Sequence, residues 1–182
     1  MIQEKIGQGD LLYHAVHGLC KVDNVSKQLH NGKQVLSYAL VPKVMDRMKV
    51  RYVMAAPDLE ESGFHFLISI KEANRILSYL KAGKVAAVPP GVKAPEECTF
   101  AEENQTWVLA RAILTSSQDN PAIKHQRKRE LLERAAKGLV GEFAHVFELT
   151  LKDTANMIRK CLGQTSKINP LVLTALVRAS ED

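Results

Sequence analysis

The amino-acid sequence predicts an α+β fold in two domains, a small antiparallel β-sheet or barrel over residues 1–66 and an all-α helical bundle over residues 67–182. Three observations predict this division. Short apolar segments separated by turn signals fill the chain up to about residue 66. Apolar residues at helical spacing begin after Ser69, and a proline-rich connector over residues 84–98 precedes further helical sequence.

The first domain contains short segments with the composition of β-strands, at residues 9–16, 18–25, 34–41 and 48–55. Turn signals separate them at His17-Gly18, at Asn31-Gly32 and after Pro42. Asn-Gly is the favoured pair for the tight turn between two antiparallel strands. Several short strands with such turns predict a small antiparallel sheet or barrel.

The second domain is marked by residues that begin and end helices. The first helix is expected to follow Ser69 and to end at Gly83, because apolar residues between them recur at helical spacing: Ile70, Ala73, Ile76, Leu77 and Leu80. Later helix starts are expected at capping or Asn-Pro signals: the Thr99-x-x-Glu102 capping box, Asn120-Pro121, Thr150 and Asn169-Pro170. The long helix that Asn120-Pro121 opens is expected to reach about Phe147, and the next helix to end at Gly163.

Composition indicates a globular chain of the cytoplasm. Hydrophobic residues make up 46% of 182 residues, and no apolar run reaches the length of a membrane span. The N-terminus lacks the pattern of a signal peptide, and the three cysteines have no metal-site or disulfide spacing. A formal net charge of +5 favours nucleic acid or another acidic partner.

The chemical motifs of enzymes are missing from the sequence. It contains no nucleophile elbow, no phosphate-binding loop and no dinucleotide fingerprint, so it predicts neither a catalytic site nor a cofactor. His14-x-x-His17 suggests half of a metal site or a proton-transfer pair, but this spacing suits neither a helix nor a strand. A turn or backbone-capping role is the favoured interpretation of these histidines. Cys20 and Cys161 lie in apolar runs and are expected to be buried and inert.

Two basic clusters remain as candidate binding sites. Lys43, Arg47, Lys49 and Arg51 surround one expected strand, where Lys49 and Arg51 share a face. They form either a cationic face for an acidic protein or a solvated strand face. The second cluster lies at the start of the long helix and contains Lys124, Arg127, Lys128 and Arg129. It fits nucleic-acid phosphates, or else a solvent-exposed face with paired charges.

Trp107 is the only tryptophan and carries two open interpretations. It is either part of the helical core or an apolar wedge against a nucleotide step.

The order of these features resembles the CarD/CdnL family of bacterial transcription regulators. GDLLYHAVHGLCKVDNV resembles the start of that family, and KVRYVMAA resembles its basic strand, with Arg51 in the place of a polymerase-contacting arginine. SIKEANRILSYLKAG is similar to the helix that follows, and KRELLERAAKGLVGEFAHVF to a later helix. A second family arginine near the hairpin aligns with Gln28, beside Lys27.

The resemblance implies a Tudor-like N-terminal domain that binds the β subunit of RNA polymerase, and a helical domain that contacts promoter DNA. The polymerase-binding residues would be Arg51, Lys49, Arg47 and Lys27. The DNA-binding residues would be Trp107, Arg111, Lys124, Arg127 and Lys128, with Trp107 as the minor-groove wedge and the cations on phosphates.

The expected function is therefore that of a cytoplasmic transcription factor that stabilises the open promoter complex with weak sequence specificity. The chain is expected to need no cofactor, to avoid membranes and to be a monomer when free. Two alternatives stay open, a polymerase-binding adaptor without a DNA wedge and a basic protein-interaction module.

Overall fold

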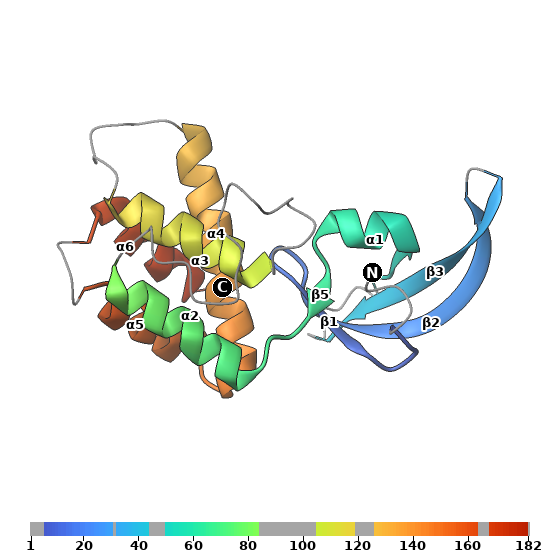
Figure 1. The fold of residues 1–182 in the computed structure, drawn as a ribbon, viewed down its shortest axis with the longest axis horizontal. Coiled ribbons are helices and arrows are strands. Elements are labelled where there is room, and N and C mark those ends of the chain that lie inside the picture. Colours follow the sequence, from blue (N-terminus) through green and yellow to red (C-terminus); the bar gives the residue numbers. More distant parts are fainter. Residues whose placement is uncertain are drawn as a thin grey trace. The chain divides into compact units, whose positions relative to one another are not determined.

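The structure is a computed structural model that describes residues 6–30, 32–43, 50–83, 105–118, 126–163 and 168–181. The chain divides into two compact units, Met1–Leu67 and Ile68–Asp182. The predicted boundary between residues 66 and 67 falls one residue before this division. The first unit holds an antiparallel sheet and the second holds helices, so the α+β prediction is confirmed (Figure 1).

The first unit is a five-stranded antiparallel sheet with the strand order β4-β3-β2-β1-β5. Its elements are β1 (Leu11–His14), β2 (Gly18–His30), β3 (Lys33–Pro42), β4 (Tyr52–Ala55), α1 (Ala56–Ser62) and β5 (His65–Phe66). Gly18 and Gly32 lie at the predicted turns with φ of 68° and 75°, a left-handed conformation that glycine adopts without strain. The second strand continues five residues beyond its predicted end at residue 25, and the sequence reading missed α1 and β5.

One face of the sheet builds the core of the first unit. Side chains alternate across a strand, so every second residue of β2 and β3 points to the same side. Val22 and Leu40 are paired opposite each other, and both are fully buried. The short helix α1 contributes Leu59 to the same core, and Phe64 follows it.

The second unit contains five helices: α2 (Ile70–Ala82), α3 (Gln105–Gln118), α4 (Gln126–Phe147), α5 (Leu151–Leu162) and α6 (Pro170–Ala179). The side chain of Ser69 accepts a hydrogen bond from the N–H of Glu72 at the start of α2, and Gly83 ends that helix at φ 65°. Thr150 caps α5 in the same way. These helix boundaries confirm the predicted ones.

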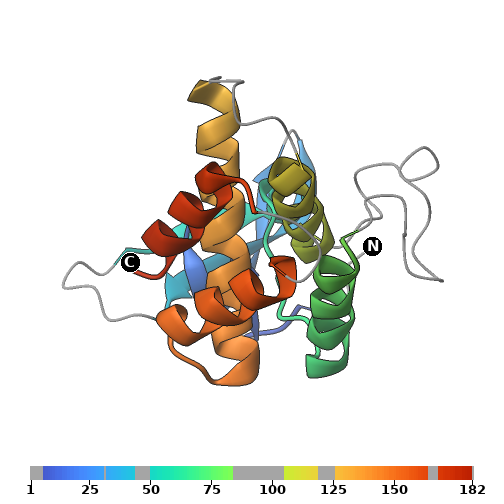
Figure 2. The ribbon, with the colours of Figure 1, turned by 90° about the vertical axis from the view of Figure 1, so that its left-hand side faces the viewer.

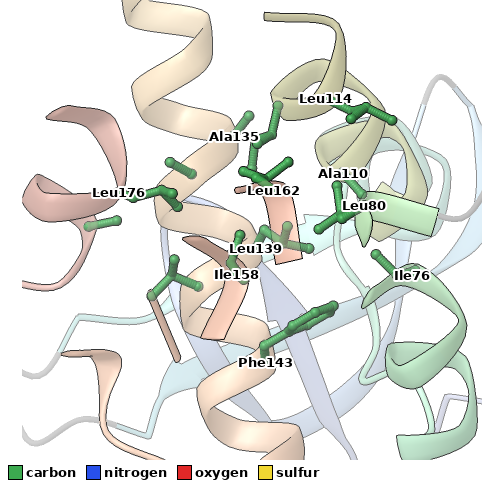
Figure 3. Close-up of a cluster of buried hydrophobic side chains, with 14 of the residues drawn as sticks. Ile76, Leu80, Ala110, Leu114, Ala135, Leu139, Phe143, Ile158, Leu162 and Leu176 are labelled. Carbon is green, nitrogen blue, oxygen red and sulfur yellow. The ribbon is translucent and has the colours of Figure 1, made fainter. Parts of the chain in front are cut away.

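Helix α4 runs through the centre of the helical unit, with α2, α3, α5 and α6 around it (Figure 2). Its apolar side meets the other helices in one continuous core, where Leu139 and Phe143 of α4 lie close to Ile158 of α5 (Figure 3). The three side chains have no exposed surface. Burying large apolar side chains of this kind contributes about 1.5–3 kcal/mol each.

Three predictions of secondary structure lie outside the described residues. They are the proline-rich connector over residues 84–98, the Thr99-x-x-Glu102 capping box and the Asn120-Pro121 helix start.

Candidate functional site

Arg51 lies directly before β4, which is an edge strand of the sheet, and its side chain is exposed. Its Nη2 donates a hydrogen bond to Oδ2 of Asp23, and the two side chains of this ion pair are 56% and 45% exposed. Asp23 is the extra residue of a β-bulge between Val22 and Asn24, which turns it out of the regular strand pairing. The guanidinium of Arg51, the predicted polymerase contact, is therefore exposed at the surface and forms an ion pair with Asp23.

An apolar side chain accompanies Arg51 on the same face of the sheet. Val53 follows two residues later and is 56% exposed, so it lies beside Arg51 along the strand. We call Arg51, Val53 and Asp23 the β4 surface. An edge strand can pair with an extended segment of another chain through backbone hydrogen bonds, and its cation and apolar side chain can contact the side chains of that segment.

The other predicted polymerase-binding residues do not gather at the β4 surface. Val53 pairs with Ala39 on β3, whereas Lys27 pairs with Leu36, three residues away along the same strand. An odd separation along a strand places two side chains on opposite faces, so Lys27 points away from the face of Arg51. Arg47 and Lys49 lie outside the described residues.

His14 of the histidine pair caps the backbone of the first turn. Nδ1 of His14 accepts hydrogen bonds of 3.1 Å from the N–H groups of Val16 and His17. Its Nε2 lies 3.0 Å from the carbonyl oxygen of Ser62, and because a carbonyl only accepts, the Nε2 proton is donated there. The ring of His17 stacks on His14 with centroids 4.6 Å apart. The capping interpretation is confirmed, and His14 ties the β1–β2 turn to the end of α1.

This geometry predicts that the first unit loses stability in acid. Desolvation lowers the pKa of His14 below its ordinary 6.5, and the charges of nearby His17 and His65 lower it further, against the bond to Ser62, which raises it. As the pH falls below 6.5, His14 therefore binds a proton more readily in the unfolded chain than in the folded chain. The free energy of unfolding then decreases progressively until the pH reaches the lowered pKa of His14 in the folded chain. Amide exchange at Val16, corrected for its intrinsic pH dependence, should accelerate over this range.

His14→Asn is the matched control, because asparagine offers a backbone-capping oxygen that does not titrate in this range. The acid-dependent increase in exchange should be smaller in this variant. An unchanged pH dependence would assign the effect to groups other than His14.

The predicted DNA-binding cations of α4 occupy its N-terminal turns. Arg127 and Lys128 are exposed, and this end of α4 extends beyond the neighbouring helices (Figures 1 and 2). Glu133 offsets part of the charge, since its Oε1 accepts hydrogen bonds from Arg129 and from Arg178 of α6. Lys124 lies outside the described residues.

Trp107 lies in the core of the helical unit, which corrects the prediction of a wedge against DNA. Its side chain is 4% exposed, and its ring meets the ring of Tyr79 edge-on at a centroid distance of 5.5 Å. Nε1 donates a hydrogen bond of 2.5 Å to Oε1 of Glu72. An indole buried on its apolar faces and satisfied at its one polar atom has no surface to insert between bases.

Arg111 lies one helical turn beyond Trp107 on α3. Burial raises the pKa of the Tyr79 hydroxyl, and the nearby guanidinium of Arg111 opposes this rise. Thr106, next to Trp107, donates a 2.8 Å hydrogen bond to Glu142 of α4. Glu142 is far along α4 from Arg127, roughly 22 Å at 1.5 Å per residue. Trp107, next to Thr106 in the chain, is therefore far from the α4 cations.

Glu142 is a key residue that the sequence reading missed. It is fully buried, and its two carboxylate oxygens accept hydrogen bonds from the N–H of Ile68, at 3.3 Å, and from Oγ1 of Thr106, at 2.8 Å. It therefore holds the residues before α2 and the start of α3 against α4. The sequence does contain one signal for its burial, because Glu142 lies on the apolar side of α4 between Leu139 and Phe143.

The thiols of the described residues do not form a reactive site. Cys20 has no exposed surface, and burial raises its pKa to about 11. Cys161 is half-buried, and burial raises its pKa as well, although Lys81 opposes the shift. A raised pKa disfavours the nucleophilic thiolate.

Within the described ranges, no three histidine, cysteine or carboxylate side chains are grouped to bind a metal ion. In the same part of the chain, no helix has the length and apolar character needed to cross a membrane. Comparison of the whole chain with protein-family models and with curated proteins finds no match.

Proposed function

We propose that this protein is a transcription regulator similar to the CarD/CdnL family, which binds the β subunit of RNA polymerase and promoter DNA near the upstream edge of the bubble. The observation that carries the proposal is the β4 surface, an exposed arginine and an exposed valine on the edge strand of a small antiparallel sheet. The sheet would serve as a Tudor-like docking domain. Its partner surface would be acidic, because Arg51 is the cation that the surface presents.

The DNA contact of the proposal belongs to the N-terminal turns of α4. Arg127 and Lys128 are exposed there at the projecting end of the helix. Contacts from such cations to phosphates provide affinity with little sequence preference. Docking on the polymerase would hold α4 at high effective concentration near the promoter, so its intrinsic affinity for DNA can be weak. Tighter binding to open than to closed DNA would stabilise the open complex by that difference.

The burial of Trp107 favours a second candidate function. A chain that binds the polymerase but inserts no wedge into DNA would act as an adaptor, using α4 for phosphate contacts alone. Promoter opening would then depend on Arg51 and on the α4 cations. It would not depend on the chemical nature of the Trp107 ring.

Binding to the isolated polymerase β lobe tests the proposal. Arg51→Glu should weaken binding at least tenfold, since a hydrogen bond to a charged group contributes about 1.5–3 kcal/mol. Asp23→Asn should tighten binding by up to about fivefold, because it frees Arg51 from an exposed ion pair that contributes roughly 0–1 kcal/mol. Titration calorimetry with the purified lobe measures both changes.

Lys71→Glu is the control for charge reversal, since Lys71 is exposed on α2 in the helical unit. It should leave the affinity for the lobe unchanged. Wild-type chain that does not bind the lobe, or equal losses in the Arg51 and Lys71 variants, would refute the proposed contact.

A further inference from the structure

The β2–β3 hairpin ends in a two-stranded arm that no other strand supports. Residues 27–30 pair with residues 33–36, from Lys27 opposite Leu36 to His30 opposite Lys33. Strand β1 pairs with β2 only as far as Lys21, and β4 pairs with β3 only as far as Ser37. Figure 1 shows the end of the hairpin extending past α1. We call these eight paired residues the β2–β3 arm.

The arm carries positive charge and no carboxylate. The sequence contains no aspartate or glutamate between Asp23 and Asp46. Lys27 and Lys33 are exposed, and neither forms an ion pair with another described residue. Leu29, beside the turn, is 76% exposed, the highest value among the large apolar side chains of the described residues. The arm thus presents uncompensated positive charge together with an apolar side chain.

The two lysines point to opposite sides of the arm. Lys27 and Leu29 are two residues apart on β2 and share one face, together with Gln34, the partner of Leu29. Lys33 pairs with His30, which lies on the other face, as does Gln28. A cation and an amide are therefore available on each side. A strand ribbon with side chains on both faces is about 10 Å thick.

We propose that the β2–β3 arm is a nucleic-acid contact that enters the major groove of duplex DNA tip first, with weak sequence preference. The major groove is about 12 Å wide and admits a two-stranded ribbon. Lys27 and Lys33 reach phosphates on the two walls of the groove, and Leu29 contacts the apolar methyl groups of thymine. The contact goes beyond the proposed function, in which α4 holds the phosphates, and it assigns Lys27 to DNA.

The side chains of the arm fit DNA better than they fit an acidic protein. Protein interfaces are depleted in lysine and depend on buried aromatic residues and arginine. The described residues of the arm include two lysines and two glutamines, and none of the phenylalanine, tyrosine, tryptophan or arginine residues that anchor protein interfaces. Lysine with amide side chains is typical of phosphate, sugar and base-edge contacts.

The test is fluorescence anisotropy of the full chain on a short labelled duplex over a series of salt concentrations. The variant Lys27→Gln with Lys33→Gln should bind at least tenfold more weakly at low salt. The slope of log affinity against log salt should fall by about 1.8, since each lost phosphate contact removes about 0.9. Leu29→Ala should weaken binding roughly threefold and leave this slope unchanged, because it removes an uncharged contact.

The matched control is Lys21→Gln with Lys71→Gln, which removes the same charge from exposed positions outside the arm. Thermal unfolding by circular dichroism verifies that each variant folds. Equal effects of the arm and control variants, or no effect of the arm variant, would overturn the proposal. So would an arm variant that keeps its DNA affinity and loses binding to the polymerase β lobe.

The polymerase contact has a separate readout. Arg51→Glu leaves both arm lysines in place, so the DNA salt slope of the full chain should be retained. Failure of Arg51→Glu to weaken lobe binding would refute the proposed polymerase contact while the arm measurement stands by itself.

Discussion

Trp107→Ala should lower the free energy of unfolding of the helical unit by about 3–5 kcal/mol, the usual cost of truncating a large aromatic residue in a core. The ring is 4% exposed and packs against Tyr79, so its removal leaves a cavity next to α2. The carboxylate of Glu72 also loses the donor at Nε1. Denaturant unfolding followed by far-ultraviolet circular dichroism measures the change, because Trp107 is the only tryptophan and its fluorescence disappears with it.

Two variants divide this loss into its parts. Trp107→Phe keeps an aromatic ring and removes the Nε1 donor, so it should cost less than the alanine variant. Glu72→Gln keeps an oxygen acceptor for Nε1 and should cost the least. The core position of Trp107 would be contradicted if the Trp107→Ala protein unfolded at the same denaturant concentration as the wild type. If that variant also failed to open a promoter, the result would favour Trp107 as a wedge against DNA.

Local signals in the sequence predicted the helix boundaries well. Ser69 and Thr150 each accept the N–H of the third residue that follows, a contact contained within a few residues of chain. Asn169 accepts the N–H of Leu171 in a similar way. Such contacts do not depend on the rest of the fold, so sequence alone was enough to place them.

The candidate site was harder to predict because it depends on long-range packing. The periodicity of α3 assigned Trp107 to one helix face, but the position of α2 buries that face and brings Glu72 to the indole. The contact between Arg51 and Asp23 likewise joins residues 28 apart and depends on a bulge in β2. A single sequence contains no local signal for a bulge at Asp23 or for the helix that covers Trp107.

Glu142→Ala is expected to lower the free energy of unfolding by about 2–6 kcal/mol, because it leaves two buried donors unsatisfied and each costs about 1–3 kcal/mol. The donors are the N–H of Ile68 and the hydroxyl of Thr106, and the carboxylate that accepts them has no exposed surface. The variant should loosen both the start of α2 and the start of α3. Hydrogen exchange at the Ile68 amide measures the loosening before α2. Denaturant unfolding measures the total loss in the free energy of unfolding.

Thr106→Val separates the hydrogen bond from the cavity that alanine leaves. By itself it removes the hydroxyl donor and leaves one oxygen of Glu142 without that partner, so it should destabilise the helical unit. In the Glu142→Ala background there is no carboxylate that could lose this hydrogen bond. There, Thr106→Val should lower the free energy of unfolding by less. The difference is the coupling energy of the pair, expected at about 0.5–3 kcal/mol. Additive effects of the two substitutions would mean that the hydrogen bond between Thr106 and Glu142 does not contribute to stability.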